Sequence, residues 1–163
     1  MAAVVAACCA LPAQPCAARN RAVLIGVAAY DEPSIRSLEG PRNDVLLLWR
    51  RLTRAGFAPE DIRVLAEGLP ERADAPRPHA PPTRAEILAA LADLGDRAQA
   101  GDFVVIHFSG HGSTQPEGPP AEGADPEPGG RVQVLLPKDA GLYDSAARTI
   151  RNAGVDKEIG PAL

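Results

Sequence analysis

Apolar residues along this chain form short continuous runs that alternate with helical stripes. The runs are residues 21–30 (RAVLIGVAAY), 62–66 (IRVLA) and 103–108 (FVVIHF). Each predicts a strand, and the near-continuous first run is typical of a strand covered on both faces. Two stripes with i, i+3, i+4, i+7 spacing separate them. Their members are Val45, Leu48, Trp49 and Leu52, then Ile87, Ala90, Leu91 and Leu94. The order predicts an α/β fold with a mostly parallel sheet and helices on both faces.

Residues that start and stop helices flank both stripes. Gly40 and Pro41 precede the first stripe, where Asn43 or Asp44 is expected to cap the helix, and Gly56 is expected to end it. A Thr83-x-x-Glu86 capping box opens the second helix.

The remaining segments are less regular. Residues 67–82 and 112–130 are rich in Pro, Gly and acidic residues, which predicts loops. Residues 131–137 contain a further apolar run, and residues 156–163 resemble the first turns of a helix.

Composition excludes several classes of protein. The 163 residues correspond to about one domain. The net charge of −4 gives no reason to expect a nucleic-acid partner. No apolar run approaches the roughly 20 residues of a membrane span. No Gly-x-Gly-x-x-Gly follows the first apolar run, so a nucleotide site is not favoured.

The N-terminus, residues 1–18, has two interpretations. Its small apolar residues and Cys16-Ala17-Ala18 resemble a secretory signal with its cleavage region, which would place the protein outside the cytoplasm. No Lys or Arg precedes Arg19, so a disordered N-terminus of a cytoplasmic protein is the alternative. We expect residues 19–163 to form the domain. All three cysteines (Cys8, Cys9 and Cys16) precede it, and no Cys/His spacing predicts a metal site.

The candidate chemistry lies in residues 107–113 (HFSGHGS), at the carboxyl end of the third predicted strand. Sites gather at such strand ends in α/β sheets. An imidazole at His111 can take a proton near neutral pH, and the Gly112 N–H is free to donate to a substrate oxygen. The alternative is that His111 is a loop histidine bonded to a nearby carbonyl. We expect His107 to be a satisfied core histidine and His79 to be exposed.

HFSGHGS resembles the catalytic-histidine motif of caspases and metacaspases. Four further stretches resemble that family in the same order: RAVLIGVAAY, LEGPRNDVLLL, VLLPKDAG and DKEIGPAL. The resemblance covers residues 21–163 and implies the histidine-bearing N-terminal part of a peptidase C14 domain. It implies a caspase-like three-layer sandwich with a mostly parallel sheet, incomplete at the C-terminus.

The resemblance implies a cysteine endopeptidase with His111 as general base and a protein or peptide as substrate. In caspases the cysteine follows the histidine by about 50 residues, but no cysteine follows Cys16 here. We therefore expect a piece of a longer enzyme that is inactive by itself. The alternative is a non-catalytic caspase-fold interaction module.

Asp44 matches the Asn-Asp segment of metacaspases. The resemblance implies that an acidic pocket there receives Arg or Lys of the substrate, while a helix cap is the simpler role. Many metacaspases use calcium through paired aspartates, which residues 129–134 lack. Glu117, Glu122, Asp125 and Glu127 could bind Ca²⁺ through several carboxylate oxygens, but their Pro/Gly-rich spacing looks more like a solvated loop. We therefore predict no cofactor and no metal, with calcium as the alternative that the sequence does not support.

Overall fold

The computed structural model describes residues 18–118, 127 and 129–155. Its elements, in chain order, are β1 (Asn20–Gly26), α1 (Gly40–Arg54), the 3-10 turn η1 (Pro59–Asp61), β2 (Ile62–Ala66), α2 (Arg84–Arg97), β3 (Phe103–Ser109), β4 (Gly112–Pro116), β5 (Arg131–Leu135), β6 (Tyr143–Asp144), β7 (Thr149–Ile150) and β8 (Gly154–Val155). The predicted alternation of strands and helices up to β3 is confirmed.

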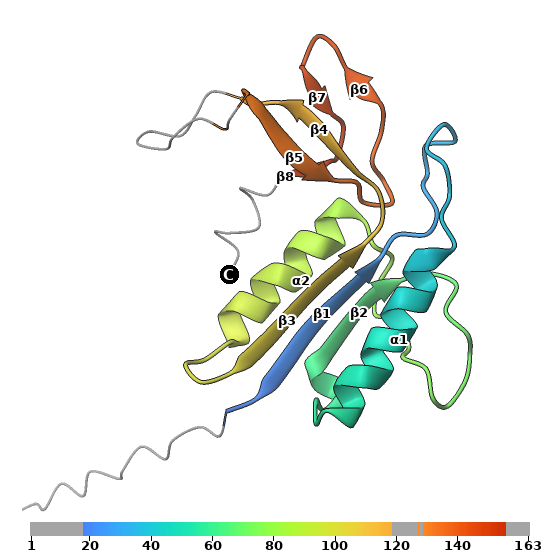
Figure 1. The fold of residues 1–163 in the computed structure, drawn as a ribbon, viewed down its shortest axis with the longest axis vertical. Coiled ribbons are helices and arrows are strands. Elements are labelled where there is room, and N and C mark those ends of the chain that lie inside the picture. The colour runs from blue at the N-terminus through green and yellow to red at the C-terminus, as the bar shows by residue number, and fades with distance from the viewer. Residues whose placement is uncertain (1–17, 119–126, 128, 156–163) are drawn as a thin grey trace, which may run out of the picture.

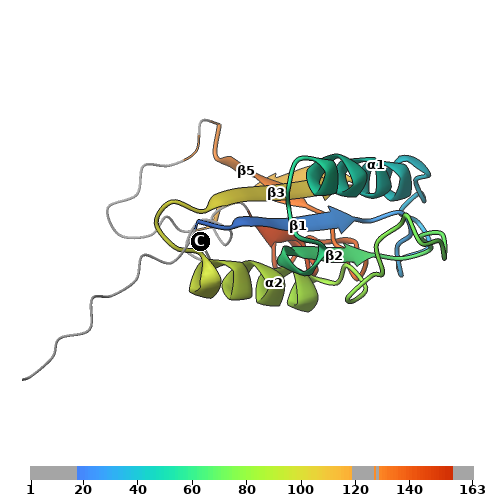
Figure 2. The ribbon, with the colours of Figure 1, turned by 90° about the horizontal axis from the view of Figure 1, so that it is seen from below.

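A three-stranded parallel sheet with the order β2-β1-β3 forms the centre of the molecule. Helix α1 covers one face of this sheet and α2 covers the other (Figures 1 and 2). The predicted mostly parallel sheet between two helical layers is therefore confirmed. Residues 67–82 form the predicted connection without a helix or strand of its own.

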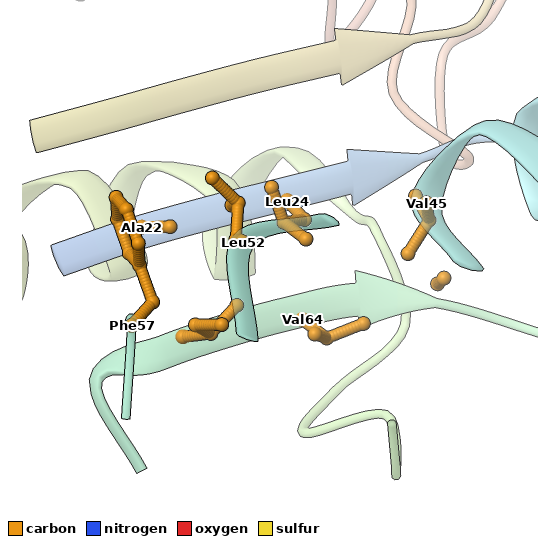
Figure 3. Close-up of a cluster of buried hydrophobic side chains, with 8 residues drawn as sticks. Ala22, Leu24, Val45, Leu52, Phe57 and Val64 are labelled. Atoms are coloured by element: carbon orange, nitrogen blue, oxygen red, sulfur yellow. The ribbon is translucent and has the colours of Figure 1, made fainter. Parts of the chain in front are cut away.

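The core consists of two clusters on opposite faces of β1. Ala22 and Leu24 pack with Val45 and Leu52 of α1 (Figure 3). The alternate β1 residues pack on the other face against α2, and these are Val23, Ile25 and the adjoining Val27. Because successive strand residues point to opposite faces, a strand buried on both faces needs the continuous apolar run seen in the sequence.

The first turn of α1 packs closely against the end of β1. A Cβ added to Gly26 would lie 2.7 Å from Val45 Cγ2 and 2.9 Å from the Pro41 carbonyl oxygen, so only glycine fits. The helix begins at Gly40, and Glu39 in the cap position makes no side-chain hydrogen bond to it. The prediction that Asn43 or Asp44 caps α1 is wrong, because both residues lie inside the helix.

Helix α2 begins with half of the predicted capping box. The Thr83 hydroxyl accepts a hydrogen bond from the Glu86 N–H at 3.4 Å, but the Thr83 N–H donates to the Pro81 carbonyl instead of to Glu86. Asp139, far along the chain, accepts a bond from the Arg84 N–H at 2.8 Å. Its negative charge is favourable at a helix N-terminus, so α2 is fixed partly by the segment that follows β5.

A second, antiparallel sheet with the order β4-β5-β8 follows β3, and β6 and β7 form a hairpin beside it (Figure 1). Residues 112–116, predicted as a loop, form β4, and the run 131–137 contributes β5 to this sheet. The sequence GSTQP has little strand propensity, but pairing with β5 holds it extended. Residues 1–17 and the helix predicted at 156–163 lie outside the described residues.

The two edges of the parallel sheet differ. At the β2 edge, the His79 N–H donates to the Val64 carbonyl at 2.8 Å, and His79 Nδ1 accepts from the Val64 N–H at 3.0 Å. At the other edge, β3 pairs only with β1 among the described strands. Phe103, Val104 and Ile106 of β3 are 63%, 37% and 38% exposed. Within the described residues, the sheet therefore has one covered edge and one open, apolar edge.

A buried carboxylate joins the start of β1 to the start of β3. Asp102, with a side chain only 4% exposed, accepts hydrogen bonds from the Arg19 N–H at 2.7 Å and from Arg21 Nε at 2.8 Å. These bonds, together with one from the Gln99 N–H, lower the pKa of Asp102 to about 2. The ionised form is thus favoured in the folded state.

We predict that this carboxylate contributes to acid stability. A lowered pKa stabilises the fold above the ordinary aspartate value of 3.8, and the contribution is lost as pH falls toward about 2. Asp102→Asn should lower the urea midpoint at pH 7 and flatten its decline between pH 4 and 2. Asp93→Asn, which removes an exposed i,i+4 pair with Arg97, is the control and should change the midpoint little. Equal pH profiles for Asp102→Asn and the unmodified protein would contradict the prediction.

Candidate active site

His111 lies where the two sheets meet, between the end of β3 and the start of β4. It follows the carboxyl end of β3, as predicted, although β3 is an edge strand of the described sheet and not a central one. The turn is tight at Gly110, where an added Cβ would lie 3.0 Å from the Phe108 ring and 3.1 Å from Val27 Cβ. Glycine at this position therefore lets the chain turn and places a partly exposed His111 at the edge of the sheet formed by the carboxyl ends of its strands.

Three hydrogen bonds hold His111. Its N–H donates to the Tyr30 hydroxyl at 2.8 Å, and its carbonyl accepts from the Leu136 N–H at 3.0 Å. Its ring Nε2 lies 2.8 Å from the Arg36 carbonyl oxygen. Since a carbonyl only accepts, Nε2 must carry the proton in this contact, which leaves the Nδ1 lone pair as the basic position. Nδ1 has no partner among the residues that the structure describes.

The two interpretations of His111 are therefore compatible. It is a histidine bonded to a nearby carbonyl, and that bond also fixes which ring nitrogen is left to accept a proton. The arrangement can accept a proton at Nδ1 and share the resulting positive charge with the Arg36 carbonyl.

Asp44 reaches the same turn from α1. The Ser109 hydroxyl donates to Asp44 Oδ2 at 2.6 Å, a short charge-assisted bond. Ser109 ends β3 and lies two residues before His111, so the structure brings both predicted site residues to one edge of the sheet. The Asp44 side chain belongs to an exposed residue, and its carboxylate lies beside the turn between β3 and β4 that carries His111.

The Gly112 N–H points away from its neighbouring strand. Hydrogen-bonded pairs alternate along antiparallel strands, and the Leu136 N–H bonds His111 while the Glu117 N–H bonds Gly130. In this register Gly112, opposite Leu135, is a non-hydrogen-bonded position. Its N–H is therefore directed outward from β4, as a donor to a substrate oxygen requires.

Lys138 fixes the loop after β1 to the segment after β5. Its ammonium bonds the Asp31 carboxylate and lies 3.6 Å from Glu67, and the pKa of Lys138 is raised chiefly by the bond to Asp31. The Asp31 N–H also donates to the Lys138 carbonyl at 2.9 Å. The loop that carries Tyr30 is thus joined to the second sheet by both side chain and backbone.

Sequence reasoning missed the roles of Tyr30, Arg36, Ser109 and Lys138. The rule that sites gather at the carboxyl ends of strands could have found Tyr30, because it directs attention to the residues after Val27. Arg36 contributes only a backbone carbonyl, which residue type does not reveal.

The other histidines differ in part from expectation. His107 is strand-internal as predicted, but its Nε2 is buried without a hydrogen-bond partner in the described part of the chain, so it is not satisfied there. His79 is exposed as predicted, yet its ring also accepts the Val64 N–H.

The described residues contain no group of three or more His, Cys, Asp or Glu side chains that could hold a metal ion. The Glu117 carboxylate accepts the Glu127 N–H at 2.7 Å, and Glu122 and Asp125 lie outside the described residues. No helix within the described ranges has the length and apolar character needed to cross a membrane.

Comparison with known proteins identifies the family. The model of the metacaspase, peptidase C14 domain matches residues 20–145, which include both His111 and Asp44. The chain belongs to the metacaspase family. This metacaspase chain is thus related to cysteine peptidases, and the resemblance of its sequence motifs is confirmed at the level of the family.

Similar proteins include two from Arabidopsis thaliana and one from Aspergillus oryzae. Metacaspase-4 of Arabidopsis is 36% identical over 125 residues, covering 76% of this chain and 27% of the relative. Metacaspase-9 of Arabidopsis is 40% identical over 102 residues, covering 60% of this chain and 28% of the relative. Metacaspase-1B of A. oryzae is 37% identical over 103 residues, covering 63% of this chain and 23% of the relative. The chain spans about a quarter of the length of these relatives.

A solved structure shows the same fold. The crystal structure of a Geobacter sulfurreducens protein matches with a TM-score of 0.57 at 19% identity. The match covers 88% of this chain and 44% of that protein.

We predict that the turn between β3 and β4 does not accept a side chain at Gly110. Gly110→Ala places a methyl group against Phe108 and Val27, so the free energy of unfolding should fall by about 1–3 kcal/mol in urea titrations. Gly112→Ala is the matched control, because its Cβ would lie 3.5 Å from the nearest atom. That control should change stability by less than about 1 kcal/mol. Equal effects of the two substitutions would show that the turn is not sterically restricted.

Proposed function

We propose that this metacaspase chain is the histidine-bearing part of a cysteine endopeptidase in which His111 is the general base. The observation that carries the proposal is the 2.8 Å contact between His111 Nε2 and the Arg36 carbonyl. This contact makes Nδ1 the proton acceptor and leaves the Nδ1 edge of the imidazole available to a nucleophile.

The proposed reaction uses groups at the carboxyl ends of the parallel strands. His111 Nδ1 takes the proton of a cysteine thiol, and the thiolate attacks the scissile carbonyl carbon. The carbonyl oxygen becomes an oxyanion that accepts a bond from the Gly112 N–H. The imidazolium then gives its proton to the leaving amine as the C–N bond breaks, which leaves the acyl group on the cysteine sulfur. Water, deprotonated by His111, attacks this thioester; the C–S bond breaks, the acid product leaves and the proton returns from His111 to the sulfur.

We propose that the cysteine belongs to a longer protein and follows His111 in the sequence, as the cysteine of caspases follows the histidine. Cys8, Cys9 and Cys16 are the chain's only cysteines, and all precede β1. We propose that a longer protein adds a parallel strand to the open edge of β3, where Phe103, Val104 and Ile106 are exposed. Carboxyl ends of neighbouring parallel strands meet at one edge of a sheet, so a cysteine ending that strand would lie beside His111. The coverage of only a quarter of the relatives' length supports this.

Asp44 is the proposed determinant of cleavage after Arg or Lys. Its carboxylate lies at the same edge as His111, and the Ser109 hydroxyl holds it through one oxygen at 2.6 Å. An ionised carboxylate retains further acceptor positions, which suit a guanidinium or ammonium group of the substrate. Protein or peptide chains with a basic residue before the scissile bond are therefore the proposed substrates.

The alternative is a non-catalytic interaction module. The open edge of β3 favours this function too, since unpaired strand edges bind other chains by strand addition. The two functions differ in what they require of His111, because strand addition at β3 needs no imidazole.

We predict that His111→Ala abolishes peptidase turnover in the longer protein that carries the cysteine. Removal of the general base should lower kcat by at least about a thousandfold. His107→Ala is the matched control, because His107 lies within β3; it should reduce stability more than kcat. Peptides with Arg or Lys before the scissile bond serve as substrates. Near-normal turnover of His111→Ala would refute the general base, whereas a cysteine-bearing protein with no turnover before any substitution would favour the interaction module.

The chain itself provides a second control. Residues 19–163 contain no cysteine, so this part alone should not cleave the same peptides. Cleavage that resists a thiol-alkylating reagent would indicate a different nucleophile.

We predict that Asp44→Asn selectively impairs cleavage after basic residues. Loss of the charge partner of the substrate cation should lower kcat/KM for Arg and Lys peptides about a hundredfold. Glu39→Gln removes the same charge from an exposed position just before α1 and should change kcat/KM less than twofold. Similar losses from both substitutions, or no loss from Asp44→Asn, would assign basic specificity to other residues.

A further inference from the structure

Tyr30 lies in the loop between β1 and α1, at the contact of two parts of the core. Its ring packs against the cluster under α2 and also against the cluster of the second sheet formed by Val132, Val134, Leu136, Ala140 and Ala153. Apolar side chains of both clusters thus contact the Tyr30 ring, and this close packing leaves the ring little freedom to move.

The same loop supplies two of the groups that hold His111. Its ends are joined, because the Leu38 N–H donates to the Ala28 carbonyl at 2.8 Å. Within this closed loop, the Tyr30 hydroxyl accepts the His111 N–H and the Arg36 carbonyl accepts its Nε2–H. A shift of the loop would therefore move the backbone anchor and the ring anchor of His111 together.

Tyr30 also contacts the imidazole itself. The centroids of the two rings lie 5.3 Å apart with an angle of 32° between their planes. The ring of Tyr30 thus limits rotation of the imidazole on one side, while its hydroxyl fixes the peptide of the same histidine. Burial raises the pKa of Tyr30 although the bond from His111 opposes this, so the phenol stays neutral and acts only as an uncharged anchor.

We propose that Tyr30 is the positioning residue of His111, which selects the Nε2-protonated tautomer by holding the histidine backbone and ring against the Arg36 carbonyl. This deepens the proposed function and rests on it for the catalytic consequence. The hydrogen bonds and the ring contact that orient His111 involve only residues of this chain.

The decisive test is the tautomer of His111 in the chain of residues 1–163, measured by ¹⁵N NMR of the imidazoles at a pH where they are neutral. We expect the Nε2–H form in the unmodified protein. Tyr30→Phe keeps the ring but deletes the acceptor of the His111 N–H, and should lower the ratio of Nε2–H to Nδ1–H forms about three- to tenfold.

The chain offers two matched controls for this measurement. Its only other tyrosine, Tyr143, is 49% exposed, and Tyr143→Phe should leave the His111 signals unchanged. His79, which bonds the Val64 N–H through Nδ1, should keep its tautomer in every variant and so report on the fold. An unchanged His111 tautomer ratio in a folded Tyr30→Phe variant would overturn the inference.

Kinetics of the longer, cysteine-bearing protein test the catalytic consequence. Tyr30→Phe should lower kcat about tenfold and change KM less than twofold, because an imidazole that points incorrectly impairs chemistry but not substrate binding. An unchanged kcat in an enzyme that His111→Ala inactivates would overturn the inference and leave the proposed function standing. If no activity depends on His111, the proposed function fails, and the NMR result alone decides whether Tyr30 orients the ring.

Discussion

The pairing of β1 with β3 is the interaction on which the site depends. Seven residues of each strand pair in parallel register, and the Val27 N–H extends the ladder by donating to the Ser109 carbonyl at 2.8 Å. Both strands therefore end at the same level. The loop after β1, with Tyr30 and Arg36, and the turn after β3, with His111, meet there because β1, which is buried on both faces, cannot shift its register without exposing its buried residues.

The parallel half of the fold could be predicted because its signals are local. Continuous apolar runs marked the three strands, and Val45 and Leu52 marked the buried face of α1. Strand β4 could not be predicted in this way, since GSTQP becomes a strand only through its pairing with β5. Likewise, Asp44 looked like a helix cap because its partner Ser109 is 65 residues away in the sequence.

The candidate site was predictable only where side chains form it. His111 and Asp44 could be named from residue type and spacing, whereas the Arg36 carbonyl and the Gly112 N–H are backbone groups that any residue carries. These two backbone groups matter because of the directions in which they point, which the closed loop and the antiparallel register determine. A sequence motif thus identified the base, and only the fold identified the groups that orient it.

The open edge of β3 has a consequence for the handling of this chain by itself. The strand reads FVVIHFS, with no charged residue and no proline, and it has an exposed apolar side chain on each face of the sheet. Such a segment lacks the features by which proteins prevent strand edges from pairing with one another. Without a neighbouring strand, separate copies are therefore prone to aggregate through β3, and solubility at high concentration depends on whatever covers this edge.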